Sequence, residues 1–162
     1  GQPLPRIVRR QMIVSQVFDL PRDTAILAEL ARLEGHRNID RLVADYDSGD
    51  NRFDLPGEAL FILQSKEGAS LGIGGINIDP YFDEPSIGRA RRLYIHPEYR
   101  RMGLGALLVQ KIEAHASTSF SSIQLYTASP EASAFYKSLG YKEVFNQTKV
   151  SHAKTFRRIE PR

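Results

Sequence analysis

A predicted strand that passes through a Gly- and Arg-rich turn into a helix constrains the fold of this chain more than any other feature. Residues 89–105 read RARRLYIHPEYRRMGLG. The strand-like residues 89–95 stop before Pro97, which cannot donate to a sheet ladder. Apolar residues then recur at helical spacing from about Gly103 onward, at Leu104, Leu107, Leu108 and Ile112. A strand followed closely by an amphipathic helix indicates a fold in which helices pack on a sheet.

The other segments predict the same mixture of strands and helices. Before this segment we expect a strand within residues 5–17, helices at 21–35 and 38–45, and strands at 59–64 and 71–78. After it we expect a strand at 123–127, a helix at 130–140, and strands at 141–145 and 155–159. Turn-rich loops fill 47–57 and 79–86. No repeat or linker interrupts this order, so the sequence predicts one mixed α/β domain over residues 1–162.

Composition excludes several classes of protein. With 162 residues, 41% of them apolar, the chain can bury a core without disulfides, and it has no Cys for a disulfide, a thiol nucleophile or a thiolate metal site. The four His residues lack metal-ligand spacing, so we expect no metal. Apolar runs such as residues 59–63 are too short to cross a bilayer, and no basic-then-apolar leader opens the sequence. We therefore expect a cytoplasmic protein with no membrane partner.

The charges divide unevenly along the chain. Residues 1–88 hold 9 Lys and Arg against 14 Asp and Glu, a net charge of −5, whereas residues 89–162 hold 13 against 5, a net charge of +8. One interpretation is a chance distribution over a solvated surface. The other is that the basic half meets a phosphorylated ligand and the acidic half meets a cationic one.

The turn before the helix at Gly103 has the properties of an anion site. The first turn of a helix leaves backbone N–H groups unpaired and carries a partial positive charge, so a pyrophosphate fits there. Gly103 and Gly105 let an anion approach the backbone, and Arg100 and Arg101 add cationic donors. The third Gly of a dinucleotide fingerprint is replaced by Leu108, and no P-loop pattern is present. The pattern that fits is [Q/R]-x-x-G-x-[G/A].

Residues 89–145 resemble the acetyl-CoA-binding core of the GNAT superfamily of N-acetyltransferases. Three features agree in order and spacing: the strand 92–95 followed by HPEYR, the turn at 100–106, and a block S-x-x-A-x-x-F-Y-x-x-x-G-Y from Ser129 to Tyr141. The resemblance implies a mixed, mostly antiparallel sheet of about six to seven strands flanked by about four helices. It also divides the chain into an acceptor-side half, 1–88, and an acetyl-CoA-binding half, 89–162.

The resemblance also implies cofactor contacts. The strand at 123–127 is expected to splay away from 93–95 and leave a wedge, in which the backbone of Leu93, Tyr94 and Ile95 pairs with the pantetheine arm. The residues expected at the phosphates are Arg100 and Arg101 through their side chains, and Met102, Gly103, Leu104, Gly105 and Ala106 through their amides. Ser129 stands where the family often has Asn, and we expect it to cap its helix beside the cofactor.

The implied chemistry is direct attack of a primary amine on the thioester of acetyl-CoA. This needs no covalent enzyme intermediate, which suits a chain without Cys and without a G-x-S-x-G motif. Tyr136 is expected to point its hydroxyl at the sulfur and to act as the general acid, since a phenol with a pKa of about 10 can donate to a forming thiolate. A backbone N–H of the open strand edge would stabilise the oxyanion.

The general base is not identified by the sequence. Arg89 stands where related sequences often carry Glu. The remaining candidates are Asp79, Tyr81, Asp83, Glu84 and His96, and transfer without a base is a further option when the amine arrives neutral.

The acceptor is expected to be an amine, and a cationic one is favoured if the acidic residues of 35–58 line its pocket. These are Asp40, Asp45, Asp47, Asp50, Asp54 and Glu58. A homodimer is one possible assembly, because dimers are common in the superfamily.

Two other functions remain open at this point. A catalytically silent CoA-binding module is favoured by Arg89 in the usual base position. A nucleic-acid-binding protein is suggested by the cluster of Arg89, Arg91, Arg92, Arg100 and Arg101, but the sequence lacks interleaved stacking aromatics and a helix-turn-helix signature.

Overall fold

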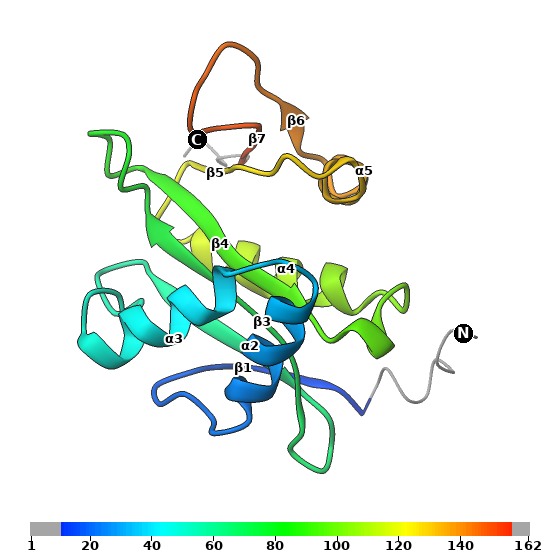
Figure 1. Ribbon diagram of the computed structural model, residues 1–162. Helices are drawn as coiled ribbons and strands as arrows, with labels where there is room; N and C mark the ends of the chain where they lie inside the picture. Colours follow the sequence, from blue (N-terminus) through cyan, green and yellow to red (C-terminus); the bar gives the residue numbers. More distant parts are fainter. Residues whose placement is uncertain (1–10, 157–162) are drawn as a thin grey trace.

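The computed structural model describes residues 11–156, which form a seven-stranded sheet with helices on both faces (Figure 1). The strands are β1 (Ile13–Gln16), β2 (Ala59–Gln64), β3 (Ser70–Ile78), β4 (Ile87–Ile95), β5 (Ser122–Leu125), β6 (Lys142–Glu143) and β7 (His152–Thr155). The helices are α2 (Thr24–Leu33), α3 (Asn38–Ser48), α4 (Leu104–Ala116) and α5 (Pro130–Ser138), with a 3-10 turn η1 (Pro97–Tyr99). The mixed, mostly antiparallel fold predicted from the sequence is confirmed.

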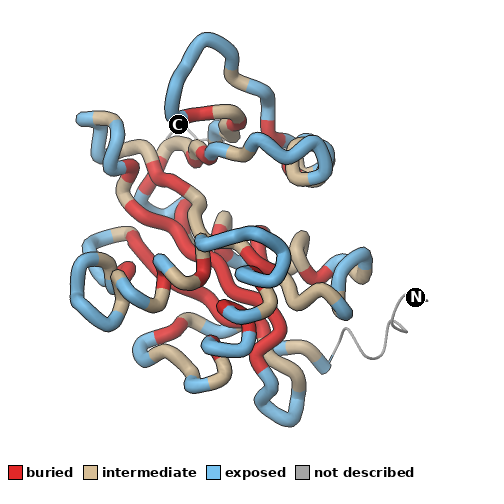
Figure 2. The backbone as a smooth tube through the Cα atoms, in the orientation of Figure 1, coloured by how far each residue is buried: buried red, intermediate tan, exposed pale blue. Residues whose placement is uncertain are grey.

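The sheet runs in the order β1-β2-β3-β4-β5-β7-β6, and only the β4–β5 pair is parallel. Helices α2 and α3 cover one face, and α4 lies against the other (Figure 1). The central strands β2 and β3 are buried along most of their length (Figure 2). Because both of their faces are covered, they are almost continuously apolar rather than alternating.

Each face of the sheet has its own core. Leu27 and Ile39 of α2 and α3 pack with Ile73 on one face, and all three are fully buried. Leu108 and Ile112 of α4 pack on the other face. The apolar stripe that predicts α4 from the sequence is therefore the stripe that is buried, which orients the start of the helix toward β4.

The parallel pair β4–β5 is short, and this shapes the rest of the molecule. The two strands pair only from Ile87 to Arg89 on β4 and from Ser122 to Gln124 on β5. Beyond that point, β5 continues its pairing with β7. Residues 90–95 of β4 therefore have no partner strand on this side within the described part of the chain.

A β-bulge bends β4 where it leaves β5. Ile73 of β3 pairs with Tyr94, but Gly75 pairs with Arg91, so β4 carries one residue more than β3 between these points. Arg92 lies in the bulge with φ of +61°, a left-handed conformation that is uncommon for a residue with a side chain. Bulges increase the local twist and re-aim side chains, and they concentrate beside active sites.

Several predicted boundaries were wrong. Helix α3 continues to Ser48, three residues past the predicted end, because Gly49 with φ of +85° supplies the left-handed C-terminal stop. Strand β7 begins at His152 rather than at 155, because its register is set by pairing with β5. Strand β6 is reduced to two residues, and η1 was not expected. Residues 5–10 and 157–159 of the predicted terminal strands lie outside the described residues. Between residues 11 and 156, no helix is long and apolar enough to cross a membrane.

Candidate active site

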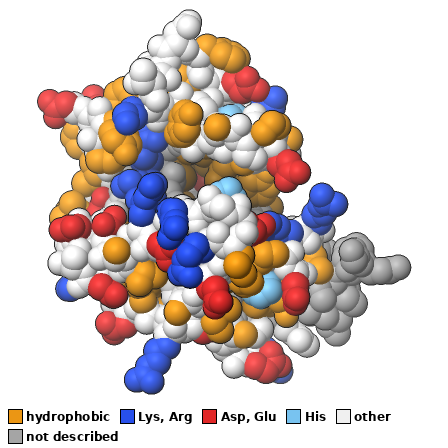
Figure 3. Space-filling view, viewed as in Figure 1, with side chains coloured by type: hydrophobic (Ala, Val, Ile, Leu, Met, Phe, Trp, Pro, Cys, Tyr) orange, Lys and Arg blue, Asp and Glu red, His pale blue; other side chains and the backbone are white. Residues whose placement is uncertain are grey.

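A cleft of about 1050 Å³ opens where β4 and β5 part. One wall is the free edge of β4, including Leu93, Tyr94 and Ile95, and the opposite wall is the end of β5 with Tyr136 of α5. The start of α4 closes one end of the cleft. Figure 3 shows the hollow between the two parts of the molecule, with Lys and Arg side chains gathered along its edge. The two walls bring together residues more than 40 positions apart in the sequence.

The N-terminus of α4 opens into this cleft. Gly103 is its N-cap residue, with φ of +78°, and no side chain of the described residues caps the helix. The Leu107 amide donates to Gly103 O at 3.1 Å, which is the first hydrogen bond of the helix. The preceding amides of residues 104–106 are thus available to a ligand, and an uncapped N-terminus beside a cleft fits an anionic pyrophosphate.

Helices α4 and α5 pack closely against each other at Gly105. A Cβ at this position would lie 3.2 Å from the Phe135 ring, so a side chain here would require this ring to shift. Two residues of the predicted phosphate loop turn inward: Leu104 is buried in a small cluster with Leu63 and Leu71, and Met102 packs against this cluster.

Arg100 is held by an acidic partner that the sequence pattern did not reveal. Its Nη1 and Nη2 donate to the two carboxylate oxygens of Glu34 at 2.7 Å each, and its Nε donates to Ile95 O at 3.1 Å. The Tyr94 hydroxyl also donates to Glu34. These hydrogen bonds, Arg100 first, lower the pKa of Glu34 to about 2. Burial and the neighbouring carboxylate raise the pKa of Tyr94.

Because of this network, Arg100 and Arg101 differ in how available they are to a phosphate. The Arg100 guanidinium is committed to Glu34 at the end of α2, so it anchors the loop to the acceptor-side half. Arg101, with φ of +64°, has no ion pair among the described residues. Arg101 is therefore the better placed of the two guanidiniums to meet a phosphate.

Tyr136 lies in an aromatic cluster at the opposite wall. Its ring packs edge-to-face on Phe135 at 5.1 Å and on Tyr141 at 5.4 Å between centroids. The Tyr141 hydroxyl is occupied by Glu113, at 3.0 Å, whereas the Tyr136 hydroxyl has no hydrogen bond to a described residue. Tyr136 is 8% exposed and lines the cleft, and burial raises the pKa of its hydroxyl. The hydroxyl therefore stays protonated at neutral pH.

Ser129 starts α5 as the sequence predicts. Its Oγ accepts a hydrogen bond from Ala132 N at 3.2 Å, and Pro130 occupies the first helical position. Ser129 also lines the cleft. The hydroxyl thus fixes the helix that carries Tyr136.

Residues 56–143 match the family model of the acetyltransferase (GNAT) domain. The chain belongs to the GNAT superfamily. A protein from Exiguobacterium sp. 255-15, named as an acetyltransferase, is 27% identical over 89% of this chain and 93% of its own, with a TM-score of 0.80. The spermidine N-acetyltransferase of Vibrio cholerae, solved with CoA and spermine, is 16% identical over 89% of this chain and 92% of its own, with a TM-score of 0.61. No curated protein matches the sequence.

This GNAT protein is an N-acetyltransferase that uses acetyl-CoA, as the resemblance implied. Arg89, at the position where the resemblance led us to look for a base, is 3% exposed on β4. The Arg89 Nε donates to Asp79 Oδ2 at 3.0 Å, and Nη2 is buried with no hydrogen-bond partner among the described residues. The guanidinium also lies 4.8 Å from the centre of the Tyr81 ring.

The candidate bases of this GNAT enzyme are mostly occupied elsewhere. Asp79 is fully buried against Arg89, Glu84 accepts the Ser86 hydroxyl at 2.9 Å, and His96 accepts the Glu98 amide at 3.2 Å. Of the five candidates from the sequence, only Tyr81 lines the cleft. None of the three candidate carboxylates, Asp79, Asp83 and Glu84, therefore lines the cleft.

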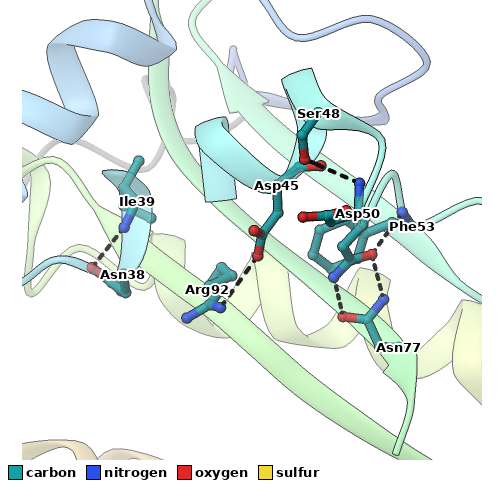
Figure 4. Close-up of polar contacts among 9 residues, drawn as sticks. Asn38, Ile39, Asp45, Ser48, Asp50, Phe53, Asn77 and Arg92 are labelled. Atoms are coloured by element: carbon teal, nitrogen blue, oxygen red, sulfur yellow. Dashed lines mark hydrogen bonds and ion pairs between the residues drawn. The ribbon is translucent and has the colours of Figure 1, made fainter. Parts of the chain in front are cut away.

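The acidic residues of 35–58 do not line the cleft. Asp40 pairs with Arg32, and Glu58 accepts the Asn77 side chain at 3.0 Å and the Ile78 amide at 2.9 Å. Asp45 of α3 faces Arg92 of β4, at 3.9 Å (Figure 4). Only His36 and Asn38 of this stretch reach the cleft. The premise of the acidic lining is therefore wrong for the cleft seen here.

Several cleft residues escaped sequence reasoning. They are His36, Asn38, Tyr126, Glu131, Thr148 and Lys149. All except Asn38 at the start of α3 and Glu131 in α5 lie outside the helices and strands, where no periodic pattern marks them. Lys149 belongs to the basic half, which is the one available signal for it.

Proposed function

We propose that this enzyme transfers the acetyl group of acetyl-CoA to a primary amine by direct attack, with Tyr136 as the hydrogen-bond donor to the departing sulfur. The observation that carries the proposal is that one cleft joins the free edge of β4, the uncapped end of α4 and the Tyr136 hydroxyl. Acetyl-CoA supplies the reactive thioester.

The binding residues are those of the two walls and the loop. The backbone of Leu93, Tyr94 and Ile95 would hold the pantetheine arm as an added strand would. The amides from Met102 to Ala106 would hold the pyrophosphate together with Arg101, while Arg100 keeps the loop in place through Glu34. Ser129 contributes by fixing the start of α5.

The transfer balances without a covalent enzyme intermediate. A carbon–nitrogen bond forms to the acetyl carbonyl, the carbon–sulfur bond breaks, and the sulfur keeps the bonding electron pair. A raised pKa makes the Tyr136 phenol a weaker acid than a thiol, whose ordinary pKa is about 8.5. Tyr136 therefore stabilises the thiolate chiefly by a hydrogen bond, and the nitrogen releases its proton to water.

Two further roles follow from β4. A backbone N–H on its free edge would stabilise the carbonyl oxygen as negative charge develops. Arg89 cannot accept a proton, so the amine must arrive in its neutral form.

The test compares Tyr136→Phe with Tyr141→Phe, a matched loss of one hydroxyl from the same aromatic cluster. Thiol release from acetyl-CoA is followed with a panel of primary amines, and acetyl-CoA binding is measured by calorimetry. We expect Tyr136→Phe to lower kcat by about 100-fold with little change in acetyl-CoA affinity. Tyr141→Phe should retain kcat. Wild-type kcat in Tyr136→Phe would contradict the role of the hydroxyl.

A further inference from the structure

Three arginines of β4 line the cleft: Arg89, Arg91 and Arg92. Arg89 and Arg91 are two residues apart on the strand, so their side chains share a face. The bulge turns Arg92 toward the same side, where it meets Asp45 of α3 (Figure 4). This is the face covered by α2 and α3, and it is distinct from the end of the cleft formed by α4.

Two of these three charges, those of Arg91 and Arg92, are poorly neutralised. Arg91 has no ion pair within residues 11–156, and the Arg92–Asp45 pair is long at 3.9 Å. Lys149 lies on the same rim, with Nζ 4.9 Å from the centre of the Tyr81 ring. Glu131 is the one carboxylate among the residues that line the described cleft. Burial and the neighbouring Arg91 charge lower the pKa of Arg92, as expected for crowded cations.

Arg89 also carries an unsatisfied hydrogen-bond donor. Its Nη2 is a charged donor that is buried without a partner among the described residues, although its Nε donates to Asp79. Such groups are costly to leave unsatisfied and call for an explanation at a functional site. The Tyr81 ring lies over Arg89 and is 49% exposed, and both residues line the cleft.

We propose that the acceptor is an amine that also carries a carboxylate, and that Arg89, Arg91 and Arg92 bind this carboxylate. The proposal rests on the function proposed above for the cleft. Guanidinium groups match carboxylates through paired N–H donors, and the buried Nη2 of Arg89 supplies one of them.

The same arginines account for an acetyl transfer without a protein base. A positive environment disfavours a second positive charge and therefore lowers the pKa of the acceptor's ammonium group. The amine then enters the reaction in its neutral form. For a dication such as a polyamine, the same field is repulsive, because the acidic residues of 35–58 lie off the cleft.

A matched series of five-carbon amines tests the preference on the full chain. The three acceptors are 5-aminopentanoate, pentylamine and 1,5-diaminopentane, which differ only in the group at the far end. We expect kcat/KM to be at least about tenfold higher for 5-aminopentanoate than for the other two, as one charged hydrogen bond allows. Equal values, a preference for the diamine, or no turnover of the amino acid would overturn the proposal.

Two variants test whether Arg91 is responsible for the preference for a carboxylate. Arg91→Gln, on a partly exposed side chain, should raise the KM for 5-aminopentanoate by about tenfold and change the value for pentylamine much less, because pentylamine has no carboxylate for Arg91 to bind. Lys66→Gln removes an exposed charge from the β2–β3 turn and should change neither. Weaker acetyl-CoA binding by Arg91→Gln, with an unchanged acceptor KM, would overturn the proposal by assigning the cluster to the cofactor.

Calorimetry with acetyl-CoA alone separates this proposal from the function on which it rests. Normal acetyl-CoA binding together with a preference for uncharged amines refutes the carboxylate site only. Loss of acetyl-CoA binding by the wild-type protein would refute the assignment of the cleft itself.

Discussion

Glu34 at the end of α2 binds the Arg100 guanidinium through both carboxylate oxygens, at 2.7 Å each. The pair joins the helical layer on the acceptor side to the loop that leads into α4. A bidentate pair of this kind fixes geometry as well as charge. The loop before α4 is therefore held from outside by a residue 66 positions earlier in the sequence.

Glu34→Gln should make the protein less stable at neutral pH, and the difference should vanish in acid. The folded-state pKa of Glu34, about 2, lies below its ordinary value of 4.5. The contribution is thus complete above about pH 4.5 and is lost as the pH falls toward 2. Since both partners are partly exposed, we expect a difference of about 1 kcal/mol. Urea unfolding from pH 7 to pH 2.5 measures it. Glu29→Gln on the exposed side of α2 is the control, and a constant difference across this range would contradict the assignment.

Arg89→Met should destabilise the protein far more than the same change at an exposed arginine. It leaves the fully buried Asp79 carboxylate without its partner, which costs about 3 kcal/mol. Adding Asp79→Asn removes the orphaned charge, so the double variant should recover much of the loss. Chemical denaturation of the two single variants and the double variant gives the coupling energy. Additive effects would show that the pair is not coupled.

The pH dependence of kcat/KM should report the acceptor amine rather than a protein carboxylate. With no base at position 89, the rate should rise about tenfold per pH unit until the pKa of the bound or free amine is reached. Initial rates measured at fixed acetyl-CoA from pH 6 to 10 test this. A plateau that begins near pH 6 and does not move between amines of different pKa would indicate a protein base instead.

Local patterns were enough to predict the elements and much of the cleft wall. The apolar stripe of α4 and the Ser129-Pro130 start of α5 can be recognised from residues close together in the sequence, and both helices form as expected. The bulge at Arg92 was not predictable, because it depends on how β4 registers against β3. The partner of Arg100 was missed for the same reason, since only the folded chain brings Glu34 to it.

The acceptor side was the least predictable part. Acidic residues between 35 and 58 are frequent in the sequence, but none of them lines the cleft, and the side chains of Asp40, Asp45 and Glu58 pair with arginines or with a backbone amide. Charge counting along a chain gives no information on which partner a carboxylate will find. The Arg89–Asp79 contact shows this most clearly, because it holds a candidate base, Asp79, away from the cleft.

The most direct test of the account is calorimetric titration with acetyl-CoA of the wild-type protein, Gly103→Glu and Gly68→Glu. Both glycines have positive φ, +78° and +89°, so the two variants carry similar backbone strain. Only Gly103 lines the cleft; Gly68 lies in the β2–β3 turn with no atom within 4 Å of an added Cβ. We predict saturable one-to-one binding for the wild type and Gly68→Glu, and none for a folded Gly103→Glu. Equal affinity in all three proteins would contradict the placement of the pyrophosphate at the start of α4.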